Sequence, residues 1–260
     1  MKIFKNILIP FKVIDKQTIA IIVIIEILFA FMLWQSFGGG LIPKPGKVFE
    51  KFIEIVSTKS FFHNLTSSAW LTVKGMFYSI IISMFLGYLS KIQVFKSLVK
   101  FVVKCRYLTL TGLIFLFTLL THDGSELKIS LLIFGIVPFF VTGMLAVFDN
   151  IESQEYELCK TLRMNNFETL WEIIIVGRLD QVFEVMRQNF AISWMMITMV
   201  EGLSMSEGGL GTMLIKANKY VDLSSVFSIL IVTLLLGIFF DFLIGTTRKW
   251  LFPYLKISQK

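Results

Sequence analysis

The sequence has few of the residues that build covalent, metal or catalytic sites. Among its 260 residues are only two cysteines, two histidines and five prolines. Cys105, Cys159, His63 and His122 are scattered and do not have the spacing of metal ligands. A phosphate-binding Gly-x-x-x-x-Gly-Lys-Ser/Thr loop, a nucleophile elbow and a His-Glu-x-x-His pattern are all absent. We therefore expect a non-enzyme with no metal or cofactor of its own.

Charged residues are also scarce, at 17% of the chain, whereas hydrophobic residues make up 55%. The apolar residues are gathered into continuous runs of about 18 or more, the length that crosses a ~30 Å hydrocarbon core. The sequence predicts an all-α polytopic membrane protein with six transmembrane helices. The expected spans are Ile19–Ser36, Ser67–Ser90, Val99–Leu120, Leu127–Phe148, Val182–Gly202 and Leu223–Thr246.

The net charge of +7 is distributed unevenly along the chain. Lysines and arginines concentrate before the first expected span, between the second and third, between the fourth and fifth, and after the sixth. The positive-inside bias places both termini in the cytoplasm and the protein in the cell (inner) membrane. We read the basic segments as topology signals and contacts for anionic lipid, not as a nucleic-acid surface.

These patterns divide the chain into three regions. Residues 1–18 form an expected interfacial amphipathic segment, 19–248 a transmembrane domain, and 249–260 a cytoplasmic tail. Glu26 and Lys74 are candidate intramembrane charges that could pair with each other. Asp241 is expected to pair with Arg248 or Lys249 near the inner end of the last span.

A polar island at about 149–181 interrupts the apolar pattern between the fourth and fifth spans. It predicts two short helices: Asp149 or Asn150 caps the first, and Asn165 with Glu168 forms a capping box on the second. An apolar stripe in the second helix would pack on the ends of the spans. Its members are Phe167, Leu170, Trp171 and Ile174. The hairpin, with its tip at 162–164, would either dock on a cytoplasmic partner or pack only on its own bundle.

Five short motifs, in order along the chain, resemble those of a known family. Glu157–Arg163 and Ile173–Val176 are similar to the EAA motif of type I ABC importer permeases. Elsewhere the chain resembles the nitrate, sulfonate and taurine subfamily of these permeases. The matching segments are Ile42–Val48, Gly124–Ile129, Val200–Glu201 and Gly209–Gly211. The glycine-rich loop that holds the last motif would be an outer gate, a re-entrant turn or a plain connector.

The resemblance implies a homodimeric permease, with a separate ATPase that binds ATP and Mg²⁺ and an outer solute-binding protein. The polar island would be the coupling hairpin. Its expected ATPase contacts are Glu157, Thr161, Leu162, Arg163, Met164, Asn165 and Phe167. The candidate residues of the translocation pathway are Trp194, Met195, Met199 and Glu201. The solute would be small and polar or anionic.

The motif departs from the family pattern at several positions. Arg163 stands where the family has glycine, and a left-handed backbone there would be unfavourable for arginine. Val176 and Asp180 replace two prolines, and Leu158 and Cys159 replace paired alanines. Two other functions therefore stay open: a self-contained secondary transporter or channel, and a non-transporting membrane scaffold. A secondary transporter is expected to show internal repeats, and none is evident.

Overall fold

The computed structural model describes residues 15–40, 42–205 and 208–253, and all regular structure in these ranges is helical. The elements are α2 (Lys16–Phe37), α3 (Pro45–Ser57), α4 (Lys59–Leu89), α5 (Lys96–Lys104), η1 (Cys105–Tyr107), α6 (Leu110–Leu120), α7 (Gly124–Asp149), α8 (Ser153–Thr161), α9 (Asn166–Thr169), the π-helix η2 (Leu170–Val176), α10 (Leu179–Leu203), α11 (Leu210–Lys219) and α12 (Leu223–Leu251). Most of the expected N-terminal segment, 1–18, and of the tail, 249–260, lies outside the described residues.

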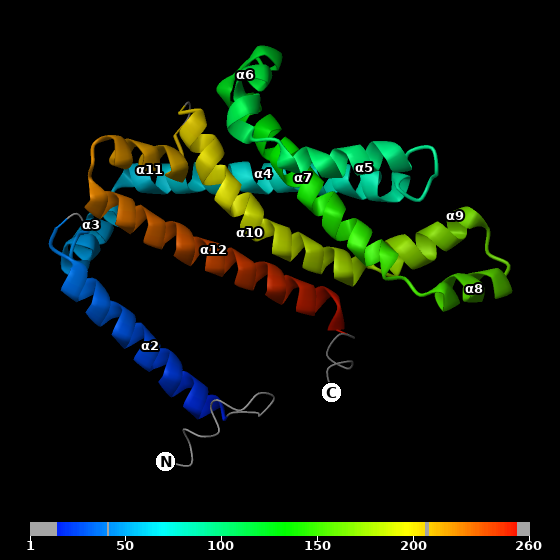
Figure 1. Cartoon of the computed structure of the whole chain (residues 1–260), viewed down its shortest axis with the longest axis horizontal. Coiled ribbons are helices and arrows are strands. Elements are labelled where there is room, and N and C mark those ends of the chain that lie inside the picture. Colours follow the sequence, from blue (N-terminus) through cyan, green and yellow to red (C-terminus); the bar gives the residue numbers. More distant parts are fainter. Residues whose placement is uncertain (1–14, 41, 206–207, 254–260) are drawn as a thin grey trace.

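The long helices form an elongated bundle, with a helical hairpin, α8–α9, at one end (Figure 1). Of the described helices, α2, α4, α7 and α12 are long and apolar enough to cross a membrane, and α5 with α6 would supply a fifth bent span. The 25-residue α10 is more polar, because Asp180, Glu184 and Arg187 lie in its first half. Six spans thus stay a prediction, whereas an all-helical chain with four or five candidate spans is what the structure contains.

The third expected span, Val99–Leu120, is wrong as a single straight helix. The chain instead forms α5 and α6, whose axes differ by 114°. The break follows Tyr107, where Leu108 and Thr109 are extended and Thr109 begins the new helix. The helix α5 carries a lysine at every fourth residue and suits a polar environment, whereas α6 is mostly apolar and suits an apolar one. The chain turns between the two helices.

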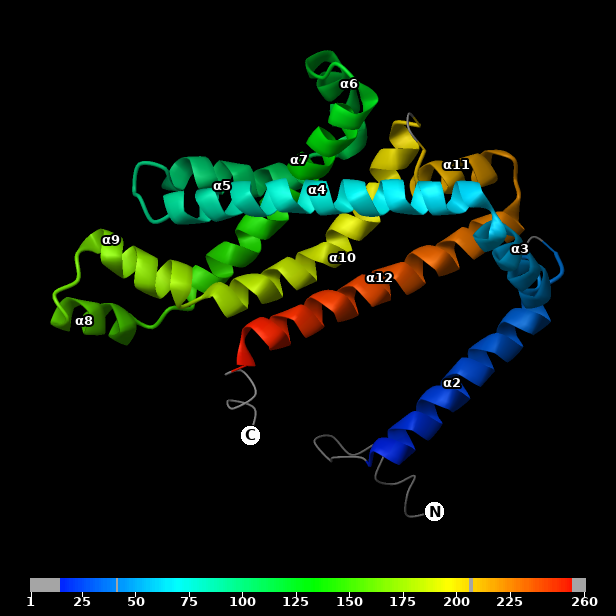
Figure 2. The same cartoon turned by 180° about the vertical axis from the view of Figure 1, so that it is seen from behind.

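The helices α4 and α7 form the centre of the bundle (Figure 2). The face of α4 that α7 covers carries small residues, which let two helices approach closely. The buried small residues of α4 as a whole are Ser68, Thr72, Gly75, Ser79, Ser83 and Gly87. A Cβ atom added at Gly75 would lie 2.3 Å from Leu132 Cδ2 of α7, so the glycine is required by the packing.

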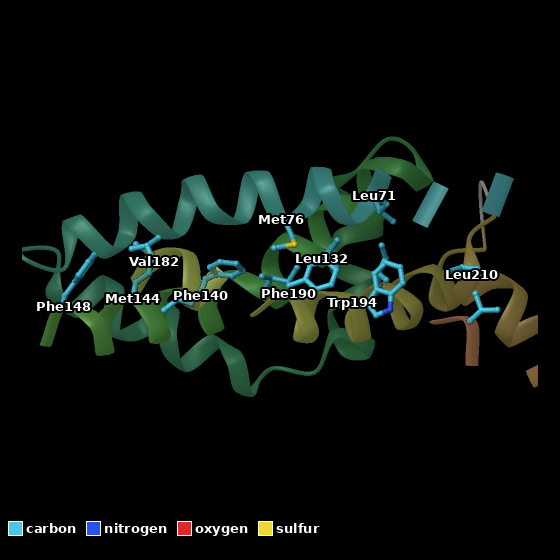
Figure 3. Packing of buried hydrophobic residues seen from close by; sticks show 14 of the residues in the cluster. Leu71, Met76, Leu132, Phe140, Met144, Phe148, Val182, Phe190, Trp194 and Leu210 are labelled. Carbon is cyan, nitrogen blue, oxygen red and sulfur yellow. The ribbon is translucent and has the colours of Figure 1, made fainter. Parts of the chain in front are cut away.

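Large side chains from α7 and α10 complete the core beneath α4 (Figure 3). Phe140 and Met144 of α7 are 2% and 1% exposed. On α10, Phe190 stacks on Trp194 with ring centroids 6.0 Å apart. The Trp194 indole N–H donates to the carbonyl oxygen of Thr233 at 2.9 Å, which joins α10 to α12.

The charged residues of α10 and α12 pair between these two helices. Asp241 accepts from Arg187 at 2.9 Å, and Arg248 pairs with Glu184. The expected pairing of Asp241 with Arg248 or Lys249 is therefore wrong, because Arg187 on the neighbouring helix is the closer partner. Arg248 also donates to the carbonyl oxygen of Asp180 at 3.2 Å, so α12 ends where α10 begins.

The first helix stands apart from the bundle, and none of its most apolar window is buried. Glu26 is accordingly exposed on α2. Lys74, halfway along α4, instead lies over the ring of Trp70, 5.2 Å from its centroid. The described structure contains no Glu26–Lys74 ion pair, since the two helices that carry these residues are not packed together.

Candidate functional site

The polar island folds into a compact hairpin that projects where α7 ends and α10 begins, as both views show (Figures 1 and 2). Its arms are α8 and the continuous pair α9–η2. Inside it, Cys159 is 6% exposed, and Ile173 and Ile174 are 7% and 3% exposed. The hairpin therefore has an apolar interior that is continuous with the core of the bundle.

The tip of the hairpin is a Schellman turn. The amide of Met164 donates to the carbonyl oxygen of Cys159, and the amide of Arg163 donates to that of Lys160, both at 3.0 Å. This pair of hydrogen bonds closes a helix whose next residue has a left-handed backbone, a position that glycine usually occupies. Here the left-handed residue is Arg163, with φ of 57°. The departure from the family glycine thus falls on the one residue of this turn where glycine is favoured.

A capping box begins the second arm, as the sequence predicts. The Asn165 side chain accepts from the amides of Phe167 and Glu168 at 2.7 and 3.1 Å. In return, the Glu168 carboxylate accepts from the Asn165 amide at 2.8 Å. Since the Schellman turn and this box share the tip, the backbone groups that the two helix ends expose are largely satisfied there.

The base of the hairpin is fixed by charge and burial. Arg178, just before α10, forms an ion pair with Glu155 of α8. The neighbouring Tyr156 is half-buried, and this burial raises the pKa of its hydroxyl above the usual value. The Arg178 Nε atom is buried with no hydrogen-bond partner in the described structure.

One expectation about the hairpin is wrong, and a second holds only in part. Asp149 and Asn150 do not cap α8: α7 continues through Asp149, and Glu152 takes the N-cap position without a side-chain hydrogen bond. The expected apolar stripe forms only in part: Ile174 is buried and Leu170 packs on the core, but Phe167 and Trp171 are 83% and 60% exposed. A π-helix follows α9, and within it Ile173 is buried beside the expected Ile174.

Four large apolar side chains of the hairpin face outward. Leu158, Leu162, Phe167 and Trp171 are between 59% and 83% exposed. Among the other expected coupling residues, Glu157, Thr161, Arg163 and Asn165 are exposed and Met164 is half-buried. Exposed apolar side chains on an otherwise polar, well-capped element are typical of an interaction surface.

A second cluster lies at the opposite end of α10, around Glu201. The Glu201 side chain is fully buried, and Ser68 Oγ of α4 lies 2.7 and 2.9 Å from its two oxygens. The amide of Gly211 donates to the same carboxylate at 2.8 Å. Buried carboxylates require such partners, because a buried charge without them is very unfavourable.

The turn between α10 and α11 is shaped to fit this carboxylate. Gly208 and Gly209 have φ of 76° and 118°, and a Cβ atom at Gly209 would lie 2.3 Å from the Glu201 carboxyl carbon. The Gly209 amide donates to Asn64 of α4 at 2.8 Å, and Lys128 of α7 donates to the Gly208 carbonyl oxygen at 3.2 Å. The three motifs at 124–129, 200–201 and 209–211 therefore meet at one place in the fold.

The four candidate pathway residues lie on different faces of α10. Trp194 and Glu201 are 8% and 0% exposed and belong to the packing of this chain, whereas Met195 and Met199 are 67% and 42% exposed. Only the two methionines are thus placed to line a pathway outside the core, and that role stays a prediction. Neither Asn64 nor Ser68 is predicted from the sequence, because lone polar residues on an apolar helix carry no distinctive spacing.

The described residues contain no group of three or more histidines, cysteines or carboxylates that could hold a metal ion. A family model described as "Binding-protein-dependent transport system inner membrane component" matches residues 17–251. The chain belongs to this family. It is a transmembrane permease component of a binding-protein-dependent ABC importer.

A solved structure shares the fold of this permease. It is described as the crystal structure of an amino acid ABC transporter with histidines, and it aligns with a TM-score of 0.58 and 13% sequence identity. The alignment covers 79% of the present chain and 94% of the other chain. No curated protein matches the sequence. Family membership implies an ATPase and a solute-binding protein as partners of the permease.

Proposed function

We propose that the hairpin is the coupling element of this permease and docks on a separate ATPase subunit, which binds the ATP and Mg²⁺. The observation that carries the proposal is the exposure of Leu162 (60%) and Phe167 (83%) at a tip whose backbone is otherwise capped. Apolar side chains of this size on a water-exposed hairpin favour a protein partner over solvent. The seven expected contact residues, from Glu157 to Phe167, lie on or beside this tip.

The base of the hairpin is suited to transmit a displacement. The Glu155–Arg178 ion pair and the buried Ile173 and Ile174 fix the arms to the start of α10. Movement of the tip by the closing ATPase dimer would therefore move α10, which carries Met195 and Met199. Alternating access requires a two-state element of this kind, whose equilibrium both the ATPase and the solute can bias.

We infer a small polar or anionic solute, of the nitrate, sulfonate or taurine type, moved by a homodimer of this chain. The half-buried Lys74 supports this solute class, since it lies midway along α4 and forms no ion pair with another described residue. A charge at that depth favours a water-filled pathway over lipid. The end of α12 lies beside the start of α10 and the hairpin, which supports a cytoplasmic C-terminus.

The test is affinity capture of the full chain from its native membrane in mild detergent, followed by mass spectrometry. Leu162→Asp and Phe167→Asp place a charge in the proposed interface. Tyr220→Asp is the matched control, because Tyr220 is 79% exposed at the end of α11, away from the hairpin. We expect an ATPase to accompany the wild type and the control, and to be lost from both tip variants.

Retention of the ATPase by both tip variants would show that the coupling surface lies elsewhere on the permease. A wild type that captures no ATPase, but still moves solute in vesicles, would instead support a self-contained transporter. A wild type that neither captures an ATPase nor moves solute would support the hypothesis of a non-transporting membrane scaffold.

A further inference from the structure

A pocket of about 420 Å³ lies between the turn after α4, the helix α5 and the end of α7. The lysines Lys91, Lys96 and Lys100 line it, together with Gln93 and one carboxylate, Asp149. The turn between α4 and α5 lies toward the same end of the bundle as the hairpin (Figures 1 and 2). Since Asp149 is the last residue of α7, the pocket also adjoins the point where the hairpin begins.

The pocket has an excess of positive charge and of hydrogen-bond donors. Lys91 Nζ lies 3.6 Å from Asp149 Oδ1 and donates to the carbonyl oxygen of Phe148 at 3.4 Å. Lys96 and Lys100 form no ion pair within the described residues. Three ammonium groups therefore face one carboxylate, and an anionic group with several acceptor oxygens would complement them.

The helix α5 separates its residues into three faces, which points to the kind of anion. Val99 packs into the bundle and is fully buried. Lys96 and Lys100 share a second face, being four residues apart. Leu98 and Phe101 are 51% and 68% exposed on a third, and Val94 just before the helix is 83% exposed. A helix that carries both a charged stripe and an exposed apolar stripe matches a molecule with an anionic head and apolar chains.

From this arrangement we propose that the pocket binds the phosphate-bearing headgroup of an anionic phospholipid of the cytoplasmic leaflet. The lysines hold the phosphate, and the acyl chains lie along the exposed apolar face of α5. The length of α4 agrees with this level in the membrane: its 31 residues extend about 46 Å, which exceeds a ~30 Å hydrocarbon core and leaves the ends among the headgroups. A bound headgroup would also compete with Asp149 for Lys91, beside the base of the hairpin.

The test is native mass spectrometry of the full chain, released from detergent and titrated with phosphatidylglycerol, with phosphatidylcholine or with inorganic phosphate. The variant is Lys96→Gln/Lys100→Gln. The matched control is Lys216→Gln/Lys219→Gln, which removes two exposed lysines from the end of α11. We expect phosphatidylglycerol adducts on the wild type and the control. The pocket variant should bind this lipid about 30-fold more weakly, or about fivefold per lysine.

Equal phosphatidylglycerol binding by the pocket variant and the control would overturn the proposal. Equal binding of phosphatidylcholine by the wild type would also overturn it, because the anionic headgroup would then carry no preference. If inorganic phosphate binds with the same affinity as the lipid, the site recognises phosphate alone and the acyl-chain part is wrong. Circular dichroism and gel filtration of each variant show that a lost adduct is not a lost fold.

Discussion

Ser68 of α4 and Glu201 of α10 are in direct contact, although 133 residues separate them in the sequence. The Ser68 hydroxyl lies 2.7 and 2.9 Å from the two Glu201 carboxylate oxygens, and it accepts from the amide of Leu210 at 2.8 Å. One hydroxyl thus connects α4, the end of α10 and the start of α11. The contact fixes the short turn that carries the Gly-Leu-Gly sequence.

Ser68→Ala should destabilise the permease. It removes a donor from the buried Glu201 carboxylate and leaves the Leu210 amide without its acceptor, a loss of about 2–3 kcal/mol in the free energy of unfolding. Thermal unfolding in detergent measures the effect. Ser67→Ala is the control, since Ser67 is only half-buried and forms no such bond. Equal melting temperatures for the two variants would show that the Ser68–Glu201 contact contributes little.

Arg163→Gly should stabilise the hairpin. Its left-handed backbone, with φ of 57°, costs a residue with a side chain about 1 kcal/mol that glycine avoids. Hydrogen exchange at the Met164 amide, which closes the Schellman turn, should slow. Lys160→Gly, in the last turn of α8, is the contrasting variant and should speed the same exchange, because glycine weakens a helix interior. Faster exchange in Arg163→Gly would contradict the argument.

Gly75→Ala should disturb the packing of α4 on α7. The new methyl group would lie 2.3 Å from Leu132 Cδ2, and overpacking of this kind costs about 1–3 kcal/mol. Leu132→Ala alone should also destabilise, by about 2–5 kcal/mol, because it opens a cavity. The double variant should lose less stability than the sum of the two single losses, as measured by melting temperatures. If the two single losses of stability simply add in the double variant, the side chains at positions 75 and 132 are not in steric conflict.

The start of α12 should weaken at low pH. Asp222 accepts from the Ser225 hydroxyl at 2.6 Å and from its amide at 3.1 Å. These bonds lower the pKa of the Asp222 carboxyl below its usual value. The folded pKa is thus below the unfolded one, so the stabilisation is complete above the unfolded value and is lost as pH falls through the folded value.

Melting temperatures of the wild type and Asp222→Asn, compared between about pH 6 and pH 3, measure this contribution. We expect a flatter pH profile in Asp222→Asn. The difference at pH 6 should be at most about 1 kcal/mol, the usual contribution of a helix cap, because Asp222 is only half-buried. Parallel profiles for the two proteins would exclude Asp222 as a source of the pH dependence.

Local sequence signals predicted the features that depend on neighbouring residues. The capping box of Asn165 and Glu168 formed as expected, since it needs only residues three apart. The position of the tip at Arg163 also followed from the motif. The apolar stripe of the second arm formed only in part, since Leu170 and Ile174 pack inward whereas Phe167 and Trp171 face outward. No pattern in the sequence marked the π-helix at Leu170–Val176.

Composition and hydrophobic run length determined that this chain is helical and built for a membrane, because apolar runs of that length have few other stable outcomes. The ordered motifs determined its family. Only the tertiary structure decided that Arg187, and not Arg248, pairs with Asp241, and that Glu201 is buried in contact with Ser68. The bend between α5 and α6 was likewise decided there. Such contacts depend on which faces of distant helices meet, and that is set by the packing of the whole bundle and not by any local pattern.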